Sequence, residues 1–172
     1  STLWRPFVGR DWTAIRMLTS DFKEFAALLN AHGVEYLVVG GYALAAHGRP
    51  RYTGDLDFWV GPGPGNARRL LDVLGAFGFG QLGISEADLA TPDRVIQLGY
   101  PPGRIDLLTS IDGVDFASAW PRRMTVPVDG VALHFIGLDD FKTNKRASGR
   151  LRDLADLEAL QEGDSDLPGA AG

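Results

Sequence analysis

The segment YLVVGGYALAAHGRPRYTGDLDFWV, residues 36–60, places two aspartates at the start of an apolar run. An apolar strand runs into Gly40 and Gly41, and Asp55 and Asp57 then open a second apolar strand. A carboxylate inside a folded core costs free energy unless a cation or hydrogen bonds compensate it. This segment therefore constrains the fold most strongly and is expected to hold the chemistry.

Asp55 and Asp57 are two residues apart in an extended segment, so their side chains are predicted to share one face of a sheet. A third acid inside an apolar strand is Asp106, in the stretch RIDLL. If the two strands are neighbours, three carboxylates converge. At roughly 6 Å and an effective dielectric constant near 20, each pair repels by about 3 kcal/mol.

A bound cation would make this cluster tolerable, and an all-oxygen ligand set favours Mg²⁺ or Mn²⁺ over zinc. Asp55, Asp57 and Asp106 are therefore predicted to be metal ligands. In the alternative interpretation the acids are solvated strand ends, with Asp57 paired to Arg49 or Arg51. The third acid and the upstream glycines favour the metal site.

The Gly40-Gly41 pair lies between a predicted strand and a predicted helix start. Glycines there let backbone N–H groups approach a phosphate, although the pair could equally form a plain tight turn. The surrounding sequence has neither the G-x-G-x-x-G dinucleotide fingerprint nor a P-loop.

The remaining patterns predict an α/β (α+β) fold with a mixed β-sheet flanked by helices. Apolar spacing predicts a helix over 20–32, and Asp129-Gly130 predicts a hairpin between strands 124–128 and 131–136. Strands are also expected at 34–39, 56–60, 94–98 and 104–108, with a short helix at 42–47 and a long last helix at 138–161.

The composition fits one globular domain, because the chain has 172 residues of which 45% are hydrophobic. We expect this domain to span 1–160 and to be followed by a disordered tail, 161–172, rich in Gly, Ser and acid. No stretch approaches the roughly twenty apolar residues of a membrane span. The absence of Cys favours a cytoplasmic location, and the net charge of −5 argues against indiscriminate binding to nucleic acid.

The stretch GGYALAAHG at 40–48, followed by Arg51-x-Thr53-x-Asp55-Leu56-Asp57, resembles the signature of the nucleotidyltransferase superfamily, which has the DNA polymerase β-like fold. The variant is most similar to small bacterial nucleotidyltransferases. These include aminoglycoside and lincosamide resistance enzymes and toxin–antitoxin proteins of the abortive-infection type. The stretch 138–157 is similar to their closing helix, so the resemblance covers roughly residues 20–160.

This resemblance implies that Asp55 and Asp57 bind divalent metal that also grips a nucleoside triphosphate (NTP). Asp106 matches the third carboxylate, which helps to hold a second metal and orients or deprotonates the attacking hydroxyl. Gly40 and Gly41 are then expected to bind the nucleotide. The implied product is a nucleoside monophosphate ester of the acceptor, with pyrophosphate released.

Positive charge for the triphosphate is predicted from residues 141–152, FKTNKRASGRLR, which contain five Lys or Arg and no acid. Lys145 and Arg150 match recurrent family positions and are assigned to nucleotide binding or to bracing the fold. Arg51 could contact the triphosphate or brace Asp57. Lys142 and Arg152 are interpreted as a solvated helix face.

The sequence leaves the acceptor open between a tRNA, a protein and a small molecule. We lean toward a toxin–antitoxin-related enzyme with a cognate toxin or antitoxin partner. The alternatives are a catalytically silent antitoxin or binding module, an antibiotic-modifying nucleotidyltransferase and a carboxylate-metal nuclease.

Overall fold

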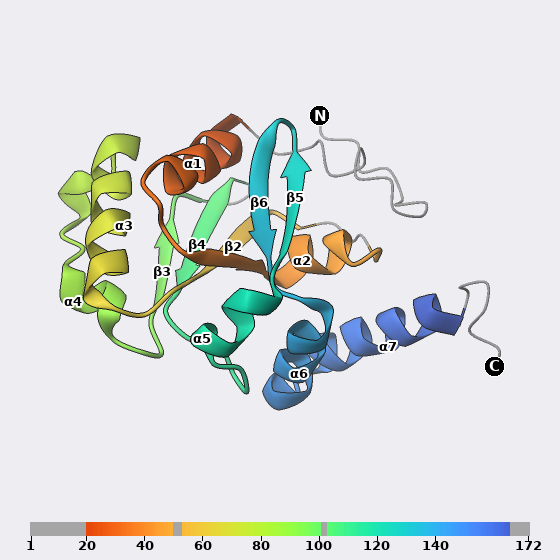
Figure 1. Ribbon diagram of the computed structural model, residues 1–172. Coiled ribbons are helices and arrows are strands. Elements are labelled where there is room, and N and C mark those ends of the chain that lie inside the picture. Colours follow the sequence, from red (N-terminus) through yellow and green to blue (C-terminus); the bar gives the residue numbers. More distant parts are fainter. Residues whose placement is uncertain (1–19, 50–52, 101–102, 166–172) are drawn as a thin grey trace.

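The structure is a computed structural model that describes residues 20–49, 53–100 and 103–165, and it contains a mixed six-stranded sheet (Figure 1). The strand order is β3-β4-β2-β1-β6-β5. The strands are β1 (Tyr36–Val39), β2 (Asp55–Val60), β3 (Val95–Leu98), β4 (Arg104–Leu108), β5 (Met124–Val128) and β6 (Val131–Phe135). This confirms the predicted mixed sheet of an α/β fold.

Helices cover the sheet, and none in the described residues is long and apolar enough to cross a membrane. They are α1 (Ser20–Ala31), α2 (Gly40–Ala46), α3 (Pro64–Phe77), α4 (Glu86–Ala90), α5 (Phe116–Ala119), α6 (Leu138–Ser148) and α7 (Leu151–Ser165), with 3-10 turns at Gly80–Leu82 and Trp120–Arg122.

The two faces of β2 have different environments because successive strand residues point in opposite directions. Phe58 is fully buried and packs against Phe25 of α1, with ring centroids 5.5 Å apart. Trp59 lies on the opposite face and meets Phe116 of α5 edge to face at 5.0 Å. The aspartates of β2 share the face of Trp59, so the apolar core on the α1 side anchors the strand that carries them.

Strands β2 and β4 pair in parallel, which confirms that they are neighbours. The register places Asp57 opposite Asp106 and Asp55 opposite Arg104. Between the two strands the chain passes through α3, α4 and β3, and β3 then pairs with β4 in antiparallel fashion. Two carboxylates that are distant in the sequence therefore become direct neighbours across the sheet.

The predicted hairpin at Asp129-Gly130 is present between β5 and β6. Both turn residues have positive φ, +53° and +82°, as a type I′ turn requires. The predicted turn between β3 and β4 includes residues 101 and 102, which lie outside the described residues.

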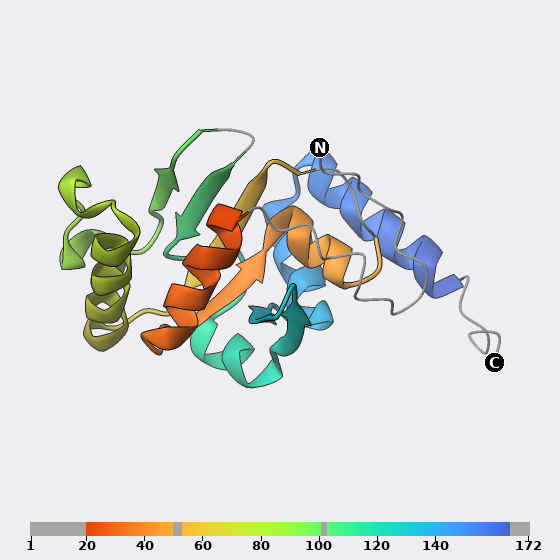
Figure 2. The same cartoon turned by 90° about the horizontal axis from the view of Figure 1, so that it is seen from above.

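The prediction of one long helix over 138–161 is wrong, because the chain forms two helices there. Gly149 ends α6 with a left-handed φ of +64° and donates its N–H to the carbonyl of Lys145 at 3.0 Å. The second helix, α7, spans Leu151–Ser165. His47 at the end of α2 packs on Phe141 of α6, and Figure 2 shows α7 (blue) running from α6 toward the C-terminal end of the chain.

Candidate active site

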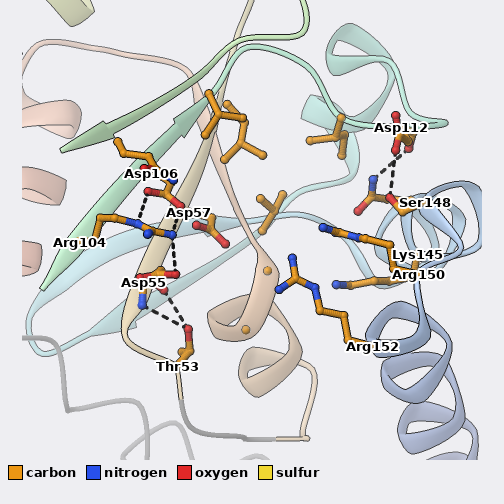
Figure 3. A pocket seen from close by; sticks show the side chains of 18 of the residues that line it. Thr53, Asp55, Asp57, Arg104, Asp106, Asp112, Lys145, Ser148, Arg150 and Arg152 are labelled. Atoms are coloured by element: carbon orange, nitrogen blue, oxygen red, sulfur yellow. Dashed lines mark hydrogen bonds and ion pairs between the residues drawn. The ribbon is translucent and has the colours of Figure 1, made fainter. Parts of the chain in front are cut away.

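An open pocket of about 730 Å³ lies between the carboxylates of β2 and β4 and the start of α7 (Figure 3). Its lining includes all the predicted site residues that the structure describes: Gly40, Gly41, Asp55, Asp57, Asp106, Lys145 and Arg150. Arg51 lies outside the described residues. The pocket thus joins the acidic and the basic motifs, which are far apart in the sequence.

Asp57 and Asp106 form the most crowded pair of acids in the pocket. They are direct partners in the β2–β4 register, and Asp106 is only 7% exposed. Burial raises the pKa of Asp57 to about 7, and the negative charges of Asp106 and Asp55 add to this rise. A hydrogen bond between the Asp57 and Asp106 carboxyls acts in the same direction. Near neutral pH the Asp57 carboxyl can therefore hold a proton.

Arg104 forms ion pairs with two of these acids, Asp55 and Asp106. Its Nε and Nη2 donate to the two carboxylate oxygens of Asp106 at 2.8 and 3.1 Å, and Nη2 also donates to Asp55 Oδ2 at 2.9 Å. The sequence analysis missed this residue. Strand alternation could have found it, because a side chain two positions before Asp106 must lie on the same face.

The donor set suits a divalent cation in charge and in chemistry. When all three carboxylates are ionised, they and the guanidinium carry a formal charge of −2, and carboxylate oxygens are ligands that Mg²⁺ and Mn²⁺ accept. Within the described residues, however, no three Asp, Glu, His or Cys side chains are already grouped so that they could hold a metal ion. Arg104 engages two of the three carboxylates, so a cation would have to share or replace these contacts.

Gly40 is required by the position of the Asp57 carboxylate. Its φ of +71° is left-handed, and a Cβ atom at this residue would collide with Asp57 Oδ2. Gly41 faces Thr53 instead, where a Cβ would come within 2.9 Å of the threonine Cβ. Both glycines therefore have packing reasons to lack a side chain, and phosphate binding at this turn stays a prediction.

We expect Gly40→Ala to disturb the acidic site as well as the backbone. A left-handed alanine costs about 1–2 kcal/mol of stability, and its methyl group must also push the Asp57 carboxylate aside. Gly33→Ala is the matched control, because Gly33 has a φ of +67° and nothing within 4 Å of the added Cβ. Chemical denaturation should show a loss in both variants, whereas Mn²⁺ titration should show weaker binding only for Gly40→Ala. Equal Mn²⁺ affinities in the two variants would contradict the assignment of Gly40.

Lys145 is held by acids rather than left open to the pocket. Its Nζ lies 3.1 Å from both Asp153 Oδ1 and Asp156 Oδ2, and its side chain is only 6% exposed. Arg150 also pairs with Asp153, at 2.8 Å from Nε to Oδ2, but its own side chain is 59% exposed. These contacts agree with the fold-bracing alternative for Lys145, because they tie α6 to α7.

Among the described basic residues that line the pocket, Arg152 is the one without an acidic partner. It is exposed, lines the pocket and forms no ion pair with any acid in the described parts of the chain. Figure 3 shows its guanidinium extending from α7 toward the side of the pocket that holds Asp55 and Asp57. The helical pattern alone placed Arg152 on a solvated face, because it did not reveal the break at Gly149 that turns α7 toward the pocket.

No family model and no curated protein sequence matches the chain. Among solved structures, the chain is similar to a Thermotoga maritima protein that is provisionally described as a nucleotidyltransferase. The two are 13% identical over 84% of this chain and 90% of that chain, with a TM-score of 0.50. An antigenic nucleotidyltransferase-like protein from Paracoccidioides brasiliensis is 16% identical over 90% of this chain and 81% of that chain, with a TM-score of 0.46.

At such low identity the likeness to the first structure concerns the fold alone. The chain therefore has a nucleotidyltransferase fold, as the sequence resemblance implied. Function has to be argued from the side chains in the pocket.

Proposed function

We propose that this chain is a metal-dependent nucleotidyltransferase, which transfers a nucleoside monophosphate from an NTP to an acceptor hydroxyl and releases pyrophosphate. The observation that supports this function best is the parallel register of β2 and β4. This register sets Asp57 opposite Asp106, with Asp55 on the same face of the sheet. The opposite side of the pocket carries the exposed side chains of Arg150 and Arg152. A nucleotidyltransferase fold that keeps three acids in such a pocket has the donor set that the reaction needs.

Each acid has a separate proposed role. Asp55 and Asp57 would hold Mg²⁺ or Mn²⁺ together with the triphosphate. A bound divalent cation supplies charge that offsets the phosphates and the leaving pyrophosphate. Asp106, hydrogen-bonded to Asp57 and buried beside it, would orient the acceptor hydroxyl and accept its proton. The low exposure of Asp106 restricts competing water at the reacting oxygen.

Arg152 and Arg150 are proposed to meet the triphosphate from the opposite side of the pocket. Arg152 has no acidic partner to give up in the described residues, whereas Arg150 would have to share its guanidinium with Asp153. Lys145 is assigned an indirect role, since its contacts with Asp153 and Asp156 position the start of α7, where both arginines lie.

We expect Arg152→Gln to weaken NTP binding about tenfold while leaving the stability nearly unchanged, because an exposed guanidinium that contacts phosphate contributes roughly 1.5–3 kcal/mol. Arg146→Gln is the matched control, since Arg146 is also exposed but does not line the pocket. Equilibrium binding of a fluorescent NTP analogue with Mg²⁺ measures both affinities. If Arg152→Gln binds as tightly as Arg146→Gln, Arg152 does not contact the triphosphate.

The acceptor is proposed to be the hydroxyl of a tRNA, a protein or a small molecule. The pocket is open to solvent, which leaves room at its mouth for a large acceptor as well as a small one. The 40–57 motif resembles toxin–antitoxin and antibiotic-modifying nucleotidyltransferases alike, and of these we propose the toxin–antitoxin type, with a macromolecular acceptor and a cognate toxin or antitoxin partner.

A transfer assay tests the proposed function. The protein is incubated with Mg²⁺ or Mn²⁺, each radiolabelled NTP in turn and a cell extract, and the labelled product is sized. Label on a tRNA or protein supports the full proposal. Label on an aminoglycoside-like compound alone supports nucleotidyl transfer but contradicts the toxin–antitoxin role. No labelled product from any NTP, in folded protein, contradicts transfer and favours the silent binding module.

A further inference from the structure

Arg104 makes the densest set of charged contacts in the pocket. Its guanidinium grips Asp106 through two nitrogens and reaches Asp55 with one of them, all within 3.1 Å. The arginine side chain is 23% exposed, while the side chains of Asp55 and Asp106 are 33% and 10% exposed. Such forked, charge-assisted hydrogen bonds are among the strongest that a carboxylate forms in a protein.

The strands do not need this ion pair to stay together. Asp55, Arg104 and Asp106 all belong to the β2–β4 ladder, where Asp55 is already the direct partner of Arg104. Arg122, which lies outside this pocket, also donates two hydrogen bonds to one carboxylate, that of Asp140. Unlike the Arg104 pair, this pair joins two separate elements, a 3-10 turn and α6. The ion pairs of Arg104 therefore join β2 and β4 at a place where the backbone ladder already joins them. What they change is the environment of the Asp55 and Asp106 carboxylates, which line the pocket.

We propose that Arg104 is a built-in counter-ion that competes with the divalent cation for Asp55 and Asp106. This inference rests on the cation site of the proposed function and adds a regulatory step to it. A guanidinium and a dication that share the same carboxylate oxygens lie within about 4 Å and repel each other. The cation therefore enters fully only when the guanidinium of Arg104 leaves those oxygens.

A triphosphate gives the released guanidinium a new partner. Arg104 borders the same pocket that would hold the NTP, so its fork can turn from carboxylate to phosphate oxygens, which have matching geometry. Cation and nucleotide then favour each other's binding, and this coupling must be equal in both directions. The empty pocket would hold a divalent cation weakly, and the nucleotide would tighten it.

The test measures Mn²⁺ binding to the nucleotide-free protein by calorimetry, so that it does not depend on catalysis. Arg104→Gln should bind Mn²⁺ at least about tenfold more tightly than the unaltered protein, because it frees the carboxylates and removes a nearby positive charge. Arg122→Gln is the control. It removes an equally forked pair with Asp140 but should leave the Mn²⁺ affinity unchanged.

Arg104→Lys keeps the test valid if the glutamine variant does not fold. A lysine retains the charge but lacks the fork, so we expect a smaller gain of about threefold in Mn²⁺ affinity. An affinity equal to or weaker than that of the unaltered protein in the folded variant overturns the inference. A second readout is the tightening of nucleotide binding by Mn²⁺, which should be smaller in Arg104→Gln than in the unaltered protein.

Failure of the inference and failure of the proposed function give different results. Tighter Mn²⁺ binding by Arg104→Gln with no transfer from any NTP would support the counter-ion role and contradict the enzymatic function. If the unaltered protein transfers nucleotides but Arg104→Gln gains no Mn²⁺ affinity, the enzymatic function is supported and the counter-ion role is contradicted.

Discussion

Asp57→Asn is expected to reduce nucleotidyl transfer by about 10³-fold or more and to raise the stability of the metal-free protein. The loss of transfer follows because a cation held by this carboxylate supplies several kcal/mol of charge stabilisation. The gain in stability follows because Asp57 is buried beside two other acids, so the amide removes a repelling charge without emptying the core. A transfer assay and a thermal melt measure the two effects.

The pH dependence of stability gives this variant a second signature. The pKa of Asp57 is about 7 in the folded chain against 3.8 as its ordinary value, with burial as the largest cause. Between these values the folded state holds more protons than the unfolded state, so the free energy of unfolding falls as pH rises from about 4 to 7. Below this window the penalty is absent, and above it the penalty is complete, at most about 4 kcal/mol. Asp57→Asn should remove this decline.

Two further measurements bear on the same assignment. Mn²⁺ should stabilise the unaltered protein more at pH 8 than at pH 6, because protons compete with the cation for Asp57. Asp72→Asn, an exposed change on α3, is the control and should alter neither transfer nor the pH profile. Transfer by Asp57→Asn at a rate near that of the unaltered protein would show that Asp57 does not hold the cation.

Lys145→Met should destabilise the protein by about 3–5 kcal/mol, which lowers the melting temperature by roughly 10 °C. The change removes the cation that lies 3.1 Å from both Asp153 and Asp156, whose side chains are 0% and 7% exposed. Removing one member of a buried charge cluster leaves the others poorly compensated. Arg146→Met on the exposed side of α6 should change the stability by less than about 0.5 kcal/mol.

The same variant separates the two roles considered for Lys145. If Lys145 acts only by bracing α6 against α7, Lys145→Met that is kept well below its melting temperature should weaken NTP binding less than Arg152→Gln does. Weaker NTP binding in a folded variant of unchanged stability would instead assign Lys145 to the triphosphate.

The acidic half of the site could be predicted from the sequence because strand geometry is simple. A period of two places Asp55 and Asp57 on one face, and the apolar residues around Asp106 mark a strand that belongs beside theirs. Strand alternation also places Arg104 on the face of Asp106. The contact of Arg104 with Asp55, however, depends on the register between β2 and β4, which long-range pairing sets and no local pattern encodes.

The basic half was harder to predict because one glycine redirects the chain. If 138–161 is one continuous helix, its spacing places Arg152 on a solvated face and gives no sign that Lys145 is buried between acids. The left-handed turn at Gly149 instead folds α7 back against α6, which buries Lys145 between Asp153 and Asp156 and brings Arg152 to the pocket. A single Gly inside a polar helical pattern predicts such a break only weakly.

Pro127 in the outer strand β5 is expected to hinder edge-to-edge pairing with another chain. Pro127 lies opposite Ala132, whose carbonyl accepts hydrogen bonds from Asn30 and Tyr36 on the β1 side. The backbone of Pro127 therefore points away from β6, toward the free edge, where proline offers no N–H to an incoming strand. At the other end of the sheet, β3 is only four residues long. Within the part of the chain that the structure describes, neither edge strand therefore presents a long, unbroken row of donors and acceptors on which another chain could polymerise.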